Sequence, residues 1–147
     1  MHKTLFIIPL ALVLGACGNG DPKLVYLNPQ SCNIEAPTNQ SIIPVKTEIP
    51  LAGWFFDKFT ANAKGAMRIQ VTSADRKVTK VIPLDALVAR SDVSNALKEP
   101  LAENSGFSTK IAADVLPPNT YEVSVIKETD SAVVVCTSNA LTFTVKE

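Results

Sequence analysis

The sequence predicts an all-β domain built as an antiparallel sandwich with a short helical insertion. Three observations support this fold class. Short apolar segments recur along the chain with turn residues between them, several segments alternate apolar and polar side chains, and ten prolines stand against six glycines. Seven or more such segments favour a two-layered structure, in which each short strand buries one face against the opposite sheet.

The first 17 residues resemble the export signal of a bacterial lipoprotein. Lys3 gives a positive start, an apolar run extends from Leu5 to Leu14, and Gly15-Ala16-Cys17 follows. The run is too short for a permanent membrane-spanning helix, which needs about 20 apolar residues. Residues Leu14 to Cys17 are similar to a lipobox, which implies cleavage before Cys17 and acylation of its thiol. The alternative is an ordinary signal peptide that happens to contain a cysteine.

The same resemblance implies a place in the cell envelope, where the acylated Cys17 would hold the chain on a lipid bilayer. Gly18 follows the cysteine, where aspartate commonly marks retention in the inner membrane of Gram-negative cells. We therefore expect the outer membrane, with the domain on its periplasmic or surface face. The expected division is a signal peptide (1–16), an acylated N-terminus and tether (17–31) and a folded domain (32–147). The apolar stretch 24–27 interrupts this tether and is a candidate to dock on the domain.

Within the domain, residues 66–72 alternate most clearly, with Met67, Ile69 and Val71 on one face. Pro44 confines its segment to a sheet edge, because proline has no amide proton to donate to a neighbouring strand. The other strands are expected at residues 32–36, 42–46, 48–56, 78–82, 107–113, 121–127, 132–136 and 141–146. Their expected inward faces include Phe107, Thr109 and Ile111; Tyr121, Val123 and Val125; and Leu141, Phe143 and Val145.

The exception to the strand pattern is residues 91–98. Ser91 or Asp92 is expected to cap a short helix there, because either side chain can accept a hydrogen bond from a free amide of the first turn.

Cys17, Cys32 and Cys136 are the three cysteines of the chain. If Cys17 carries lipid, the one remaining pair is Cys32 with Cys136, and an exported protein meets conditions in which disulfides persist. Two buried free thiols are the alternative. A metal site is not expected, because two thiols without a histidine make a poor zinc site.

Several stretches of the domain resemble a bacterial immunoglobulin-like domain. The matching residues are Gly53-Trp54 with Asp57, Ala89 to Val93, Asn104-Ser105-Gly106-Phe107, and Leu116-Pro117-Pro118 leading into Tyr121 to Val125. They span about residues 32–145. The resemblance implies an immunoglobulin-like sandwich with a modular binding or spacer role, and no reaction. Two residues depart from the family pattern: Ser91 stands where proline is usual, and Phe55 where a small residue is usual.

Structural roles are expected for the charged and aromatic residues of these motifs. Trp54 is expected in the core, with sugar stacking as the alternative. Arg90 is expected to pair with a carboxylate such as Asp57, and Asp92 to cap the helix, with ligand binding as the alternative for both.

Two loops carry further expectations. Gly106 is expected at positive φ in a turn with Asn104 and Ser105, and a ligand loop is the alternative. Residues 57–65 are expected to form a connecting loop, in which Phe59 would be a contact residue if it is exposed.

The chemistry available to the mature chain argues against an enzyme. Its one histidine, His2, lies in the expected signal peptide, which excludes Ser-His-Asp and Cys-His catalysis. A hydrolase that uses two carboxylates remains a minor alternative. The sequence has no glycine-rich phosphate loop, and no small-molecule cofactor is expected. Loss of Lys3 leaves 13 of the 14 basic side chains against 14 acidic ones, so the chain lacks the positive charge of a nucleic-acid-binding protein.

The leading interpretation is a non-catalytic envelope lipoprotein whose domain binds another envelope or surface protein or has a structural role. Two alternatives remain. One is a glycan-binding surface module, which needs exposed aromatic residues in a row or cleft. The other is an inhibitor of a periplasmic or host hydrolase that uses residues 57–65 as a plug.

Overall fold

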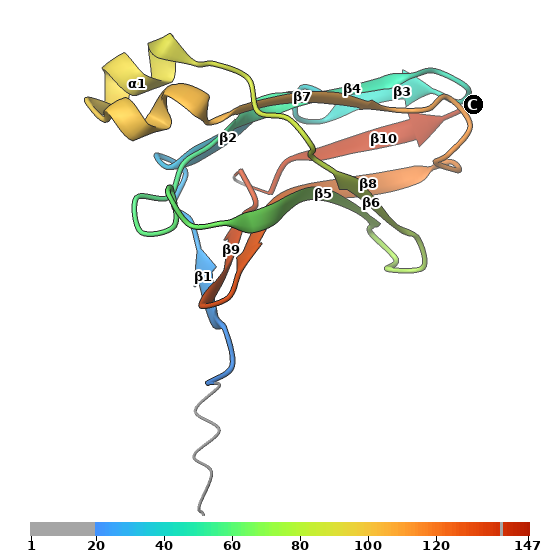
Figure 1. The fold of residues 1–147 in the computed structure, drawn as a ribbon. Helices are drawn as coiled ribbons and strands as arrows, with labels where there is room; N and C mark the ends of the chain where they lie inside the picture. The colour runs from blue at the N-terminus through green and yellow to red at the C-terminus, as the bar shows by residue number, and fades with distance from the viewer. Residues whose placement is uncertain (1–19, 139) are drawn as a thin grey trace, which may run out of the picture.

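A computed structural model describes residues 20–138 and 140–147 of the chain. Over these residues the protein is mostly β-structure, with two packed sheets and one short α-helix (Figure 1). The elements are β1 (Lys23–Tyr26), β2 (Cys32–Ala36), β3 (Ser41–Pro44), β4 (Ile49–Phe55), β5 (Gly65–Ser73), β6 (Thr79–Pro83), α1 (Ser91–Leu97), the 3-10 helix η1 (Pro100–Asn104), β7 (Gly106–Ile111), β8 (Asn119–Thr129), β9 (Ala132–Cys136) and β10 (Thr142–Lys146). No helix among the described residues is long and apolar enough to cross a membrane.

The smaller sheet has the order β2-β4-β7, and both of its pairings are antiparallel. Gly53 lies at the middle of this sheet, opposite Ile34 of β2 and Phe107 of β7. The larger sheet is organised around the long strand β8. One edge of β8 pairs with β5, which in turn pairs with β6. The other edge of β8 pairs with β10 along one part and with β9 along another.

The larger sheet is not wholly antiparallel, so that part of the predicted fold was wrong. β1 runs parallel to β9, and β3 runs parallel to β10. Both short strands come from the N-terminal part of the chain and pair with C-terminal strands, so long connections separate the partners, as parallel pairing requires. The predicted edge position of β3 is confirmed, since β3 pairs with β10 alone.

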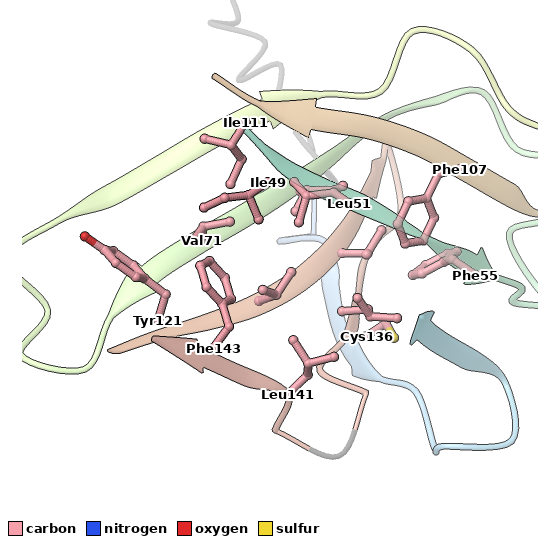
Figure 2. Close-up of a cluster of buried hydrophobic side chains, with 14 of the residues drawn as sticks. Ile49, Leu51, Phe55, Val71, Phe107, Ile111, Tyr121, Cys136, Leu141 and Phe143 are labelled. Carbon is pink, nitrogen blue, oxygen red and sulfur yellow. The ribbon is translucent and has the colours of Figure 1, made fainter. Parts of the chain in front are cut away.

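Alternation of side chains places one apolar face of each sheet in a common core (Figure 2). The predicted inward residues of β8 and β10 are confirmed, as are Phe107 and Ile111 of β7, whereas Thr109 is only half-buried. Phe107, Tyr121 and Phe143 are each at most 2% exposed. Tyr121 stacks on Phe143 with 5.5 Å between ring centroids. Its hydroxyl donates a hydrogen bond of 2.6 Å to the carbonyl of Pro117, which satisfies the one polar group of this buried ring.

The predicted strands of the domain agree with the observed ones to within two residues at each end, and the predicted helix is confirmed as α1. The stretch 24–27 does dock on the domain, since β1 pairs with β9 along its whole length. The larger sheet therefore includes residues from the segment that was expected to serve as a tether.

The expectation that Trp54 belongs to the core was wrong. Strand β4 turns Leu51, Gly53 and Phe55 inward, so Trp54 lies on the outer face of the smaller sheet, where it is half-buried. Phe55 fills the core position instead.

Candidate functional site

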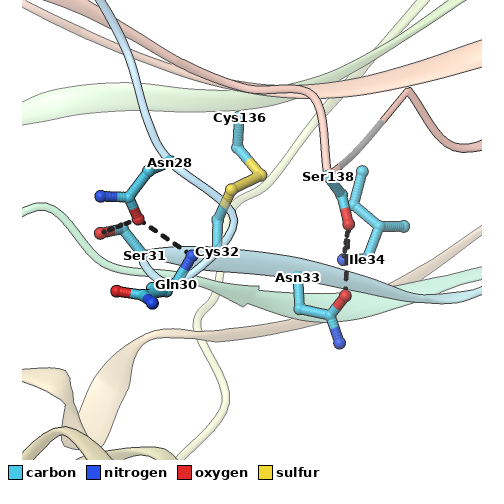
Figure 3. The surroundings of a disulfide bond; sticks show 8 residues. All are labelled: Asn28, Gln30, Ser31, Cys32, Asn33, Ile34, Cys136 and Ser138. Carbon is cyan, nitrogen blue, oxygen red and sulfur yellow. Dashed lines mark hydrogen bonds between the residues drawn. A yellow bond between two sulfur atoms is a disulfide. The ribbon is translucent and has the colours of Figure 1, made fainter.

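Cys32 and Cys136 form a disulfide, which confirms the predicted pairing (Figure 3). Their Cα atoms are 6.1 Å apart, and both residues are at most 1% exposed. Cys32 begins β2 of the smaller sheet and Cys136 ends β9 of the larger one, so the bond ties the two layers together. Beside it, the Ser138 hydroxyl accepts a 2.9 Å hydrogen bond from the Ile34 amide and donates one of 3.2 Å to Asn33 Oδ1.

Arg90 forms the most extensive charged cluster among the described residues, but its partners differ from those expected. Its Nη1 and Nη2 donate to the Glu35 carboxylate at 3.1 and 3.0 Å, and its Nε and Nη2 donate to Asp92 at 2.8 and 2.7 Å. Asp57 takes no part, because its carboxylate accepts hydrogen bonds from Thr60 in its own loop. The guanidinium thus binds two carboxylates, one from β2 and one from α1, which favours a role in fastening the helix to the smaller sheet.

Asp92 does not cap α1, contrary to expectation. The N-terminal capping position belongs to Arg90, and no side chain accepts a capping hydrogen bond there. The Ser91 hydroxyl instead donates to Glu103 of η1 at 2.7 Å. Asp92 lies in the first turn, where its carboxylate is occupied by Arg90.

The ion pair makes a prediction about pH. Hydrogen bonds from Arg90 lower the pKa of Asp92 from 3.8 to about 2. Because the folded value lies below the unfolded one, the pair stabilises the fold above about pH 4, and this contribution is lost as the pH falls toward 2. An NMR titration of the Asp92 carboxyl should show this low pKa, and Arg90→Ala should return it to nearly 4.

A matched control is Lys110→Ala, which removes a different surface ion pair, the one at 2.8 Å to Glu48. This substitution should leave the titration of Asp92 unchanged. A normal Asp92 pKa in the unsubstituted protein would show that the contact with Arg90 does not persist in solution.

Gly106 is required for a close approach rather than for a turn. The expected positive φ was wrong, since none of the glycines that the structure describes has one. Gly106 begins β7 and forms an antiparallel bridge with Val88. A Cβ atom at this position would lie 2.7 Å from both the Val88 carbonyl oxygen and the Arg90 Cγ atom. Asn104, expected in the same turn, ends η1, and Phe107 packs into the core.

The connection between β4 and β5 presents an aromatic side chain to solvent; we name residues 57–64 the Phe59 loop. Asp57 is 8% exposed and its carboxylate accepts hydrogen bonds from the amide and hydroxyl of Thr60. The Thr60 carbonyl accepts a hydrogen bond from the Lys127 ammonium of β8. Lys58 and Phe59 lie between these two fixed residues, and Phe59 is 95% exposed.

The contacts of the Phe59 loop could be anticipated only in part. The spacing of Asp57 and Thr60 is typical of a turn in which a carboxylate binds amides ahead of it. The role of Lys127 carries no such signal, because it comes from a strand 67 residues away. Burial lowers the pKa of Lys127, and the nearby Asp57 carboxylate opposes that shift.

A shallow groove crosses the outer face of the larger sheet. It is lined mainly by polar residues of β5 and β8, among them Gln70, Thr72 and Ser124, with Tyr26 of β1 at its side. Tyr26 is 67% exposed. Trp54 lies on the other sheet, so the structure does not bring these two aromatic residues into one row.

Metal chemistry has no evident site in the part of the chain that the structure describes. Within residues 20–138 and 140–147, no group of three or more histidine, cysteine, aspartate or glutamate residues is arranged to hold a metal ion.

Comparisons with known proteins show the fold alone. No family model matches the chain, and no curated protein matches it. Among solved structures, the chain is similar to part of an endo-beta-1,4-mannanase from Thermotoga petrophila, with a TM-score of 0.50 and 11% sequence identity. The match covers 80% of this chain and 20% of that enzyme, so the chain spans about a fifth of the enzyme's length.

Proposed function

We propose that the chain is a non-catalytic envelope lipoprotein that holds an immunoglobulin-like domain at a bilayer, where the domain contacts another envelope or surface protein. The observation that carries this proposal is the Cys32–Cys136 disulfide. A buried cross-link between the two sheets suits an exported protein. Of the three cysteines, it leaves Cys17 for acylation, at the end of the lipobox-like residues Leu14 to Cys17.

The strand order supports the immunoglobulin-like assignment. Such a sandwich pairs strands A, B, E and D in one sheet and C′, C, F and G in the other. Here β2, β4 and β7 correspond to A, B and E, and β6, β5, β8 and the pair β9 and β10 correspond to C′, C, F and G. The segment that holds α1 and η1 takes the place of strand D. The hydrogen bond from the buried Tyr121 to Pro117 is similar to the tyrosine corner of these domains.

Contact with a protein partner is favoured at the free edge of β6. This strand pairs with β5 alone, so the polar groups along its other edge are available to a strand from another chain. Val81 of β6 is 53% exposed and adds an apolar contact. The glycan-binding alternative gains little, because the polar groove on the larger sheet has one exposed tyrosine at its side.

Acylation is tested by growing cells with a clickable fatty-acid analogue and measuring its incorporation into the protein. We expect Cys17→Ser to abolish labelling, because the thioether needs this thiol. Cys136→Ser is the matched control: it breaks the disulfide but keeps the lipobox-like residues, and it should remain labelled. Labelling that survives Cys17→Ser, or an unlabelled original protein, would overturn the proposed anchor.

A further inference from the structure

One end of the larger sheet gathers three segments that are distant in sequence. In the strand register, Lys23 at the start of β1 lies opposite Ala132 at the start of β9, and Gly65 at the start of β5 lies opposite Thr129 at the end of β8. The start of β1, the turn between β8 and β9, and the Phe59 loop therefore share one end. Lys23, Phe59 and Ala132 line one shallow depression there. Phe59 is thus presented where the chain leaves the domain toward Cys17.

The length of chain beyond β1 limits how far this end can lie from a bilayer. Cys17 precedes Lys23 by six residues. A fully extended chain spans about 3.3–3.6 Å per residue, so the start of β1 would lie within about 20 Å of an acylated Cys17. An anchor at Cys17 therefore keeps the end that carries Phe59 close to the lipid headgroups.

The exposure of Phe59 is built into the loop by buried polar contacts. Asp57 and Thr60, on either side of the tip, are 8% and 5% exposed and bind each other. Lys127 holds the loop to β8 through the Thr60 carbonyl. These contacts fix the main chain on both sides of the tip, where the Phe59 ring is 95% exposed.

The side chains around Phe59 suit a phospholipid interface. Lys58 is 74% exposed, and Lys23 and Lys64 are also exposed at this end. Acidic groups are present too: Glu99 pairs with Lys58 at 3.5 Å, and Asp130 lies in the turn between β8 and β9. Lysines can direct their ammonium groups to headgroup phosphates while an aromatic ring enters the interface.

We infer that Phe59 inserts into the phospholipid surface that carries the anchor, so that the domain is bound to the bilayer at two points. This inference rests on the acylation proposed above. The bilayer is chosen as the occupant because the short chain to Cys17 brings this end of the sheet to it.

The test uses the full-length acylated protein in vesicles of phosphatidylethanolamine and phosphatidylglycerol, with a nitroxide spin label at Phe59→Cys. In that protein Cys17 is consumed by the thioether and Cys32 by the disulfide, so the introduced thiol is the single free one. The matched control is Ala74→Cys, which follows β5 at its other end. The two positions lie beyond opposite ends of β5, whose nine residues span about 30 Å.

For each label we take the ratio of its collision rate with dissolved oxygen to its collision rate with a water-soluble nickel chelate. We expect this ratio to be several-fold higher at position 59 than at position 74. Equal ratios in a protein whose intact mass shows the acyl chains would overturn the inference and leave the anchor standing. A mass without acyl chains would overturn both. Protection of position 59 in isolated envelopes but not in vesicles would assign the loop to a protein partner and overturn the lipid contact.

A second variant keeps the aromatic ring in place. A label at Lys58→Cys, beside the intact Phe59, should show the same preference for oxygen, and adding Phe59→Ser should reduce it toward the value at position 74. No change on adding Phe59→Ser would show that the ring does not hold the loop at the interface.

Discussion

Replacing both Cys32 and Cys136 by serine is expected to lower the free energy of unfolding by about 4–5 kcal/mol. The bond joins residues 104 positions apart. In the chain-entropy model, closing a loop of this size lowers the conformational entropy of the unfolded chain, which stabilises the fold by about 4–5 kcal/mol. Both sulfur atoms lie in the core, so the serines would also bury hydroxyl groups in apolar surroundings. For a domain of this size the loss corresponds to about 15–20 °C in melting temperature.

The measurement is urea unfolding followed by far-ultraviolet circular dichroism, with the oxidised protein, the double variant and the reduced protein side by side. Reduction of the unsubstituted protein is the matched control, since it removes the same bond without changing a side chain. It should reproduce most of the loss. A double variant within about 1 kcal/mol of the oxidised protein would show that the cross-link contributes little to stability.

The second large effect is expected for Gly53→Ala, at about 3 kcal/mol, the upper end of the usual cost of overpacking. A Cβ atom at this position would overlap the Asn33 carbonyl oxygen of β2 and lie 2.9 Å from the Phe107 ring. The main chain of β2 cannot move away without weakening its pairing with β4, because Gly53 is paired in the middle of the smaller sheet. The clash therefore cannot be relieved without weakening the pairing of β2 with β4.

Gly20→Ala is the control for Gly53→Ala, because a Cβ atom there would have no neighbour within 4 Å. It should leave the unfolding midpoint unchanged, whereas Gly53→Ala should lower the midpoint in urea. If Gly53→Ala unfolds like the original protein, β2 and β4 must be able to separate more easily than their register implies.

The alternation of apolar and polar side chains allowed most strands to be predicted, but it did not give the correct side of the sheet for Trp54. In residues 66–72 one face is apolar and the other polar, so the inward face is defined. In β4 both faces carry apolar residues, since Ala52 and Trp54 alternate with Leu51, Gly53 and Phe55. Such a strand can be located from sequence, but its two faces cannot be told apart.

The contacts of the candidate site were harder to predict because they join distant parts of the chain. Glu35, which binds Arg90, lies 55 residues before it, and nothing in the sequence distinguishes Glu35 from the other acids. Docking of the apolar stretch 24–27 was predicted, but its parallel pairing with β9 was not, because four apolar residues indicate neither a partner strand nor a direction. The disulfide was the one distant contact that could be predicted. Once one of the three cysteines is expected to carry lipid, the other two can pair in only one way.

The position of the disulfide also decides how the domain bears mechanical load. When the chain is pulled at its two ends, the disulfide gives the tension a covalent path from Cys32 to Cys136 that bypasses the backbone between them. Strands β1 and β10 lie outside this path and can peel from their partners β9, β8 and β3, but the backbone between Cys32 and Cys136 cannot be extended while the bond holds. Force applied at the two ends would therefore lengthen the molecule only by the residues that lie outside the disulfide.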